Sequence, residues 1–348
     1  MLRDVGSAEG ASGTVHAMRG GGFGKISLLA AAGVYAFAAT IGLNASSLAQ
    51  PTNVSLENQA SAYIQFREDV AEIEATPFTS AEVTRAAHRL LAAHNSDDLS
   101  SGWVAYSALL VAETEAFSKG IRDQVKSRKR KKGTRLKGRD ALLANLSEDA
   151  SFARTLPGAN EAIERVLTMT VNDGARIMSL GESFKTQAYS MQKTKWGKKR
   201  ISSGTQRLSE AQSFANDRVL APAPMLQSTE KGGVWTPLLA EPGTAWSPQW
   251  GEGDAGAASL GKNADVIMDR VLNLAARYSI DALNPKFVEV YAKNTKSDRC
   301  LSLSVLTLKQ CIAATRMPYE EAFCLGEHGL NDVAGCIGWV ADSDTDGA

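Results

Sequence analysis

Residues 300–336 read CLSLSVLTLKQCIAATRMPYEEAFCLGEHGLNDVAGC and contain all four cysteines of the 348-residue chain. Cys300 and Cys311 are eleven residues apart, with no Gly or Pro between them. Eleven residues make about three helical turns, so the spacing predicts a helix with both sulfurs on one face. Pro318 has no backbone N–H and cannot continue that helix, so we expect the chain to turn near it. Two returning helical stretches then carry Cys324 and Cys336.

The antiparallel return sets the expected pairing of the cysteines. Inner cysteines meet near the turn and outer cysteines meet at the far end. Of the three possible connectivities, we therefore expect the one with disulfides Cys311–Cys324 and Cys300–Cys336. Gly326 and Gly329 count against this pairing, because the returning arm can bend between them.

Zinc binding is the alternative use of these cysteines. Cys324 and His328 are four residues apart, a spacing that suits two ligands on one helix face. The chain has no C-x2-C or C-x4-C motif, however. The choice between sulfur bonding and zinc therefore depends on the compartment, which the N-terminus indicates.

An export signal is predicted at the start of the chain. An uncharged apolar run, residues 26–43, precedes Ser47 and Ala49, which are small residues at the positions that a signal peptidase reads. We expect cleavage after Ala49, with residues 1–49 as signal peptide and lead. An uncleaved anchor is the alternative, because the run approaches the roughly 20 residues that span a bilayer. Cysteines downstream of an export signal predict disulfides, no metal, and a periplasmic or secreted protein without a membrane span after cleavage.

The rest of the chain divides into three parts. Residues 50–220 show period-3.6 patterning with little strand alternation, which predicts a helical bundle with long helices at 99–128 and 160–196. Residues 221–262 hold half of the prolines and half of the tryptophans, which predicts an irregular strap packed on the bundle. Glycan or ligand stacking by those tryptophans is the alternative. Residues 263–348 are helical again, so the expected fold class is all-α.

Two basic clusters interrupt a chain whose 38 basic and 38 acidic residues balance. The first basic cluster, residues 126–139, holds nine Lys or Arg and no acid, and the second basic cluster is residues 193–200. Two helix reversals separate them, so we expect both at one end of the bundle. The candidate anion-binding residues are Lys126, Arg128, Lys129, Arg130, Lys131, Lys132, Arg135, Lys195, Lys198, Lys199 and Arg200.

These clusters predict a function in binding. We expect a non-catalytic envelope protein that binds or scaffolds at an anionic surface of lipid head groups, lipopolysaccharide or cell-wall polymer. A solvated loop without a partner is the alternative for such charge runs. Nucleic acid is not expected, because only Trp196 lies among the basic residues and a stacking platform is missing. A subunit of a larger envelope assembly is a further alternative.

Catalysis is the weaker hypothesis. Glu113 and Glu182 lie near apolar helix stripes, where a raised pKa would suit a general acid. Glu182-Ser-Phe184 resembles the glutamate–serine motif of lytic transglycosylases, although the Gly-Leu-Met-Gln stretch of that family is missing. The resemblance implies a cell-wall hydrolase or lyase. Exposure to solvent, or pairing with a lysine, is the competing interpretation of both glutamates. No cofactor is expected.

Overall fold

A computed structural model describes residues 54–127, 129, 131–218 and 258–343. The chain divides into two units, residues 1–48 and 49–348, and all described residues belong to the second. The predicted export signal and most of the predicted strap, residues 221–262, lie outside the described residues.

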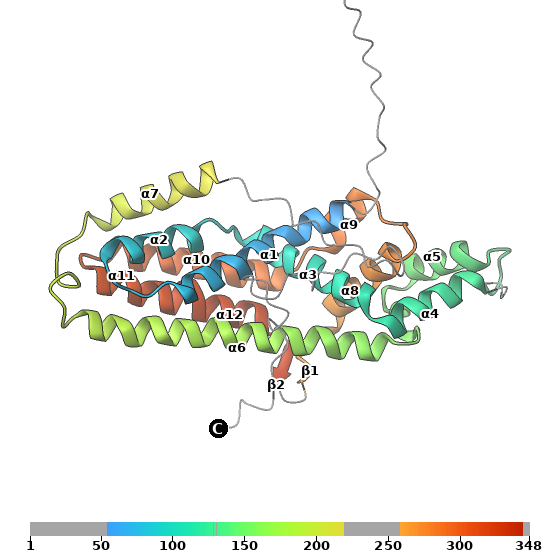
Figure 1. Cartoon of the computed structure of the whole chain (residues 1–348). Helices are drawn as coiled ribbons and strands as arrows, with labels where there is room; N and C mark the ends of the chain where they lie inside the picture. Colours follow the sequence, from blue (N-terminus) through green and yellow to red (C-terminus); the bar gives the residue numbers. More distant parts are fainter. Residues whose placement is uncertain (1–53, 128, 130, 219–257, 344–348) are drawn as a thin grey trace, which may run out of the picture. The chain divides into compact units, whose positions relative to one another are not determined.

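The second unit is built from helices, which confirms the all-α prediction (Figure 1). The helices before residue 219 are α1 (Val54–Ala75), α2 (Ala81–Ala92), α3 (Ser96–Glu113), α4 (Glu115–Lys126), α5 (Gly138–Glu148), the 3-10 helix η1 (Ala150–Thr155), α6 (Ala159–Met191) and α7 (Gly204–Asp217). Those after residue 257 are α8 (Asp265–Tyr278), α9 (Pro285–Tyr291), α10 (Thr295–Ala314), α11 (Pro318–Cys324), the π-helix η2 (Leu325–Asn331) and α12 (Asp332–Gly338). Strands β1 (Ala258–Leu260) and β2 (Ala341–Ser343) form one antiparallel pair.

Local sequence sets where these helices begin and end. Asn95 caps α3 by accepting the Asp98 amide at 2.7 Å, and Asn284 caps α9 with Pro285 at its first position. The single helix predicted at 99–128 is wrong, because Thr114 has an extended ψ of 112° and separates α3 from α4. By contrast, α6 runs unbroken through Asn172-Asp-Gly174.

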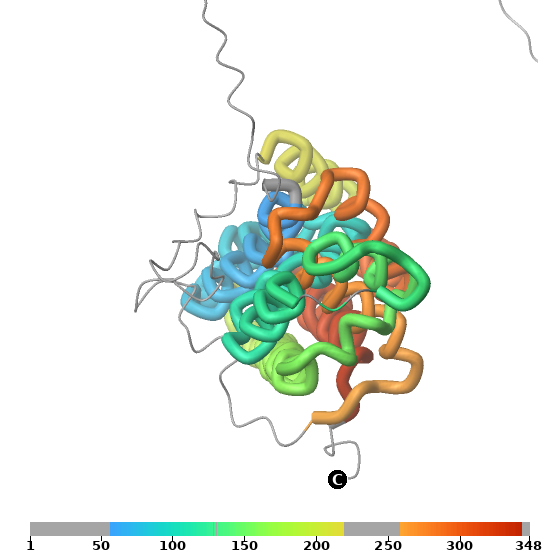
Figure 2. The backbone as a smooth tube through the Cα atoms, turned by 90° about the vertical axis from the view of Figure 1, so that its right-hand side faces the viewer, coloured from blue at the N-terminus to red at the C-terminus, as the bar shows by residue number. Residues whose placement is uncertain are grey.

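Helix α3 is the centre of the core. Its residues from Leu99 to Ala112 are all buried, as expected for a helix enclosed by others. Small residues let its neighbours approach closely: a Cβ on Gly102 would lie 2.8 Å from the amide nitrogen of Tyr63 in α1. Figure 2 shows the helices of this unit roughly end-on.

A buried polar cluster joins α1, α3 and α6 inside this core. The Arg67 guanidinium lies 3.2 Å from the Asp173 carboxylate, and the Tyr63 hydroxyl donates to the same carboxylate at 2.8 Å. Arg67 also donates to the Tyr106 hydroxyl. Buried charges need such partners, and here the partners link α6 to α1 inside the core.

The C-terminal hairpin has the predicted disulfides, Cys300–Cys336 and Cys311–Cys324, with Cα–Cα distances of 5.4 and 5.7 Å. The returning arm stays helical through Gly326, which lies in η2. This glycine allows close packing, because a Cβ there would lie 2.6 Å from the Gly181 carbonyl oxygen of α6. Oxidised sulfur excludes the zinc alternative for these cysteines, and the described residues contain no group of His, Cys, Asp and Glu suited to a metal. None of the described helices has the length and hydrophobicity needed to cross a membrane.

Candidate ligand-binding surfaces

The first basic cluster forms the connection between α4 and α5. Side chains of Lys129, Lys132, Arg135 and Lys137 are exposed there. Lys131 is different, because its ammonium pairs with Glu148 of α5. Arg128 and Arg130 lie outside the described residues. The α4–α5 hairpin thus presents positive charge at one end of the bundle (Figure 1).

The second basic cluster follows α6 and lies at the opposite end, so the prediction of a shared end is wrong (Figure 1). Gly158 packs against the backbone of Phe117, so α6 begins beside α4; Arg165 then donates to the Leu110 carbonyl of α3. Helix α6 has 33 residues and extends about 50 Å from this start, away from the hairpin. The prediction failed because α5, with 11 residues, is too short to carry the chain back along the bundle before α6 starts.

The two candidate catalytic glutamates lie far apart. Glu113 is buried with 7% of its side chain exposed and has Arg165 at 3.4 Å. Its burial raises the pKa of Glu113 to about 8, although the Arg165 charge opposes that rise. Glu182 is exposed, and hydrogen bonds from Lys185 and Asn331 hold its pKa below the ordinary value.

This placement decides what the glutamates can do together. Glu182 lies 17 residues beyond Arg165 along α6, which is about 25 Å at 1.5 Å per residue. Paired carboxylates that cleave glycosidic bonds lie within about 10 Å of each other. Glu113 and Glu182 therefore cannot act on one bond, and a glutamate mechanism would have to use one of them alone.

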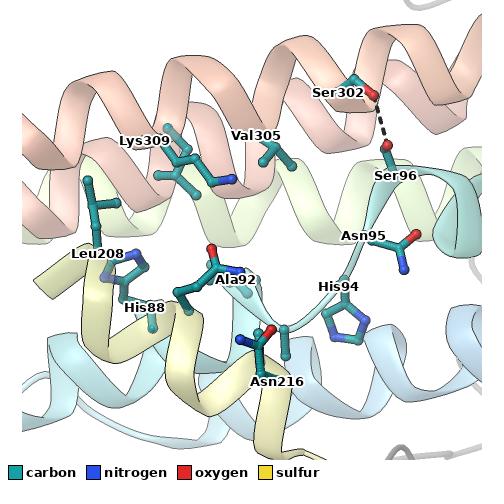
Figure 3. A pocket seen from close by; sticks show the side chains of 16 residues that line it. His88, Ala92, His94, Asn95, Ser96, Leu208, Asn216, Ser302, Val305 and Lys309 are labelled. Carbon is teal, nitrogen blue, oxygen red and sulfur yellow. Dashed lines mark hydrogen bonds between the residues drawn. The ribbon is translucent and has the colours of Figure 1, made fainter.

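The sequence did not predict a pocket of about 400 Å³ between α2, α7, α10 and the start of α3 (Figure 3). We call it the histidine pocket. Lys309 and Val305 face it from α10, Leu208 and Asn216 from α7, and His88 from α2. No Asp or Glu is among the residues that line it.

A buried carboxylate lies behind each histidine of this pocket. His88 Nδ1 is 3.2 Å from Glu321, and His94 Nε2 is 2.6 Å from Asp69. Burial alone would raise the pKa of Asp69, but hydrogen bonds from His94 and Arg218 hold it below the ordinary value. Sequence patterns do not reveal these pairs, because the carboxylates come from α11 and α1.

Helix α7 completes both carboxylate–histidine pairs. Arg207, near its start, lies 3.1 Å from Glu321, and Arg218, which follows its last residue, donates to Asp69 at 2.6 and 2.7 Å. One arginine–carboxylate–histidine cluster therefore holds each end of α7 over the pocket. The clusters serve as anchors, since each carboxylate is occupied by at least two partners.

Ser96 does not complete a triad with the Asp69–His94 pair. It is the serine nearest to His94 in sequence, but its hydroxyl hydrogen-bonds Ser302 at 2.8 Å and points away from His94 (Figure 3). Nucleophile and base must lie within hydrogen-bond reach for that chemistry. The pocket geometry supports binding better than covalent catalysis.

A groove lies at the opposite side of the C-terminal hairpin, between the end of α6 and the turn from α10 to α11. We call it the disulfide groove: it measures about 450 Å³, and the Cys311–Cys324 bond lines it together with Tyr189, Tyr319 and Phe323. A second pocket of about 400 Å³ shares Ala314 and Thr315 with it and is lined by Arg200 and Arg316. We call this second space the arginine pocket.

No family model, curated protein or solved structure matches this chain.

Proposed function

We propose that this protein is a non-catalytic envelope protein that attaches to a phosphate-bearing anionic surface through the α4–α5 hairpin. The supporting observation is the first basic cluster at the tip of that hairpin. The chain has no Asp or Glu between Asp123 and Asp140, so no acidic neighbour within the connection offsets its charge. Only Lys131, among the described cations of the connection, pairs with a carboxylate.

The energetics favour the first cluster over the second. A Lys or Arg close to an anionic membrane surface contributes about 1 kcal/mol, so several exposed cations on one hairpin add up to firm attachment at low salt. The second cluster has fewer cations and lies near Glu82, whose pKa is lowered in part by the Lys199 charge. At 0.1 M salt, screening limits the electrostatic attraction of both clusters to a distance of about 10 Å.

Sulfur chemistry and the N-terminal sequence together support the compartment that we propose. Two disulfides are typical of proteins in oxidising compartments. The uncharged run at 26–43 supports export, and we place the mature protein in the periplasm or outside the cell. Anionic lipids and lipopolysaccharide phosphates are the surfaces available there.

Vesicle binding with two matched variants tests the proposal. One variant replaces Lys129, Lys132, Arg135 and Lys137 by Ser, and the other replaces Lys193, Lys195, Lys198 and Lys199 by Ser. Each removes four exposed positive charges, so net charge is matched. At about 1 kcal/mol per cation, the hairpin variant should bind phosphatidylglycerol vesicles about a thousandfold more weakly at low salt.

The comparison between the variants carries the test. The hairpin variant should also lose most of the salt dependence of binding, while the second-cluster variant keeps it. Unchanged vesicle binding in the hairpin variant, or an equal loss in both variants, would overturn the proposal, since the second result would show a general charge effect.

A further inference from the structure

We infer that the disulfide groove and the arginine pocket together form a binding site for one single-chain anionic lipid. The acyl chain would lie in the groove, and the phosphate or carboxylate head would lie between Arg200 and Arg316. This site is at the opposite end of the bundle from the α4–α5 hairpin and does not depend on the function proposed for it.

The groove has the walls that an acyl chain requires. Tyr189 is 60% exposed there, although it is a large aromatic side chain, and its ring centroid is 6.4 Å from that of Phe323. The Cys311–Cys324 sulfurs and Ala188 complete an apolar surface. Its volume of about 450 Å³ falls in the range of small-ligand sites. Covering these rings with a hydrocarbon chain removes apolar surface from water.

The arginine pocket supplies the charge for the head group. The Ile201 amide donates to the Arg316 carbonyl oxygen at 3.0 Å, which holds the segments carrying the two arginines side by side. Within the described part of the chain, neither guanidinium forms an ion pair with a carboxylate. Two unneutralised guanidinium groups lining one pocket favour an anion, and Arg binds phosphate or carboxylate through two parallel hydrogen bonds.

The two spaces adjoin, which favours one amphiphile over two separate ligands. Ala314 and Thr315 line both, so the apolar groove borders the pocket that holds the arginines. Helix α7 packs closely at the wall of the arginine pocket: a Cβ on Gly204 would lie 2.1 Å from the Ile312 carbonyl oxygen. Lys193, Lys195, Lys198 and Lys199 are exposed at the same end and attract anions toward it.

One acidic side chain lines the groove, and it is already occupied. The Glu320 carboxylate accepts the Arg316 and Met317 amides at the start of α11, as well as the Tyr319 hydroxyl. The Thr315 hydroxyl likewise donates to the Ile312 carbonyl at 2.7 Å. Gln192 and the Tyr189 hydroxyl are the other polar side-chain groups that line the groove, too few to pair with the backbone of a peptide. The lining therefore favours a hydrocarbon chain as the occupant.

Calorimetric titration with three probes tests the site in the full-length mature protein. The probes are lysophosphatidylglycerol and lysophosphatidylcholine with the same acyl chain, both below micelle formation, and glycerol phosphate without a chain. We expect lysophosphatidylglycerol to bind at least tenfold more tightly than either of the others. Equal binding of the two lysolipids would show that the arginines do not bind the head group. Equally tight binding of glycerol phosphate would show that the groove does not bind the acyl chain. Either result would overturn the inference.

Two variants distinguish head-group binding from acyl-chain binding. Both change exposed positions, so the fold should stay intact. Arg200→Ser with Arg316→Ser should weaken lysophosphatidylglycerol binding at least tenfold and bring it to the level of lysophosphatidylcholine. Ala314→Trp should block the junction and weaken both lysolipids. Unchanged binding in either variant, with the fold checked by circular dichroism, would overturn the inference.

The hairpin variant is the control. It should bind lysophosphatidylglycerol as the unmodified protein does, so a failure of vesicle attachment and a failure of this site give different results. If the unmodified protein is a dimer that Ala314→Trp dissociates, a second copy of the chain occupies the groove and the lipid site is rejected.

Discussion

At the scale of single residues, burial separates two glutamates that looked alike in the sequence. Both Glu113 and Glu182 lie near apolar helix stripes. In the structure Glu113 is 7% exposed, whereas the side chain of Glu182 is 57% exposed and paired with Lys185. The periodicity of one helix cannot show which of its faces another helix covers, so the sequence could not separate them.

Glu113 should make stability depend on pH. Its folded-state pKa of about 8 is above the ordinary 4.5, so between these pH values the folded state holds a proton that the unfolded state has released. Stability therefore falls as pH rises through this window, by an amount on the order of a few kcal/mol. Glu113→Gln has a neutral side chain at every pH. Its free energy of unfolding at pH 9 should exceed that of the unmodified protein by at least about 1 kcal/mol.

Urea unfolding at pH 5 and pH 9 measures this difference. At pH 5 the variant and the unmodified protein should have similar stability. Glu182→Gln is the control, since the lowered pKa of Glu182 places its titration below this range. A Glu113→Gln advantage that is the same at both pH values would contradict the pKa assignment.

At the scale of elements, helical periodicity predicted the all-α class and the C-terminal hairpin, whereas the attachment of α7 was not predictable. Only Gly204, Arg207 and Ala211 are buried in α7, so apolar packing contributes little to its position. Its anchors are the buried carboxylates Glu321 and Asp69, which lie on helices distant in sequence. Long-range ion pairs leave no periodic signal in a single sequence.

Loss of one anchor should free α7 locally. Arg218→Ala leaves Asp69, which is 1% exposed, with His94 and a 3.4 Å hydrogen bond from Gln65. A buried carboxylate that loses its arginine partner is costly by about 1–3 kcal/mol. Because little else holds α7, we expect amide exchange in Gly204–Asp217 to accelerate at least tenfold while α3 is unaffected. Hydrogen-exchange mass spectrometry gives the readout.

Lys185→Ala is a suitable comparison for this experiment. It also removes a paired cation, but its partners Glu182 and Glu327 are exposed or partly exposed. Exposed pairs contribute little, so exchange in α7 should not change. Equal exchange of α7 in Arg218→Ala and the unmodified protein would show that the arginine is not an anchor.

At the scale of the whole molecule, the disulfides lower the conformational entropy of the unfolded chain. They close loops of 36 and 13 residues by sequence separation. The loop-entropy relation assigns about 4 kcal/mol to the longer loop and about 3 kcal/mol to the shorter. Cys300→Ser with Cys336→Ser should therefore destabilise the protein more than Cys311→Ser with Cys324→Ser.

Denaturant unfolding of the two double variants measures both costs. Adding reductant to the unmodified protein should lower stability by more than either double variant does, because both loops are then opened. The prediction is contradicted if the shorter loop proves to contribute more than the longer one.

By itself, the sequence determined the all-α fold and the order in which the cysteines pair. These properties depend on neighbours along the chain: apolar spacing and one reversal near a proline. The tertiary structure alone decided that the basic clusters lie at opposite ends, that Glu113 is buried, and that α7 closes a pocket. Those properties depend on how a short α5 and a continuous α6 direct the chain, and on contacts between residues more than a hundred positions apart, such as Arg67 and Asp173.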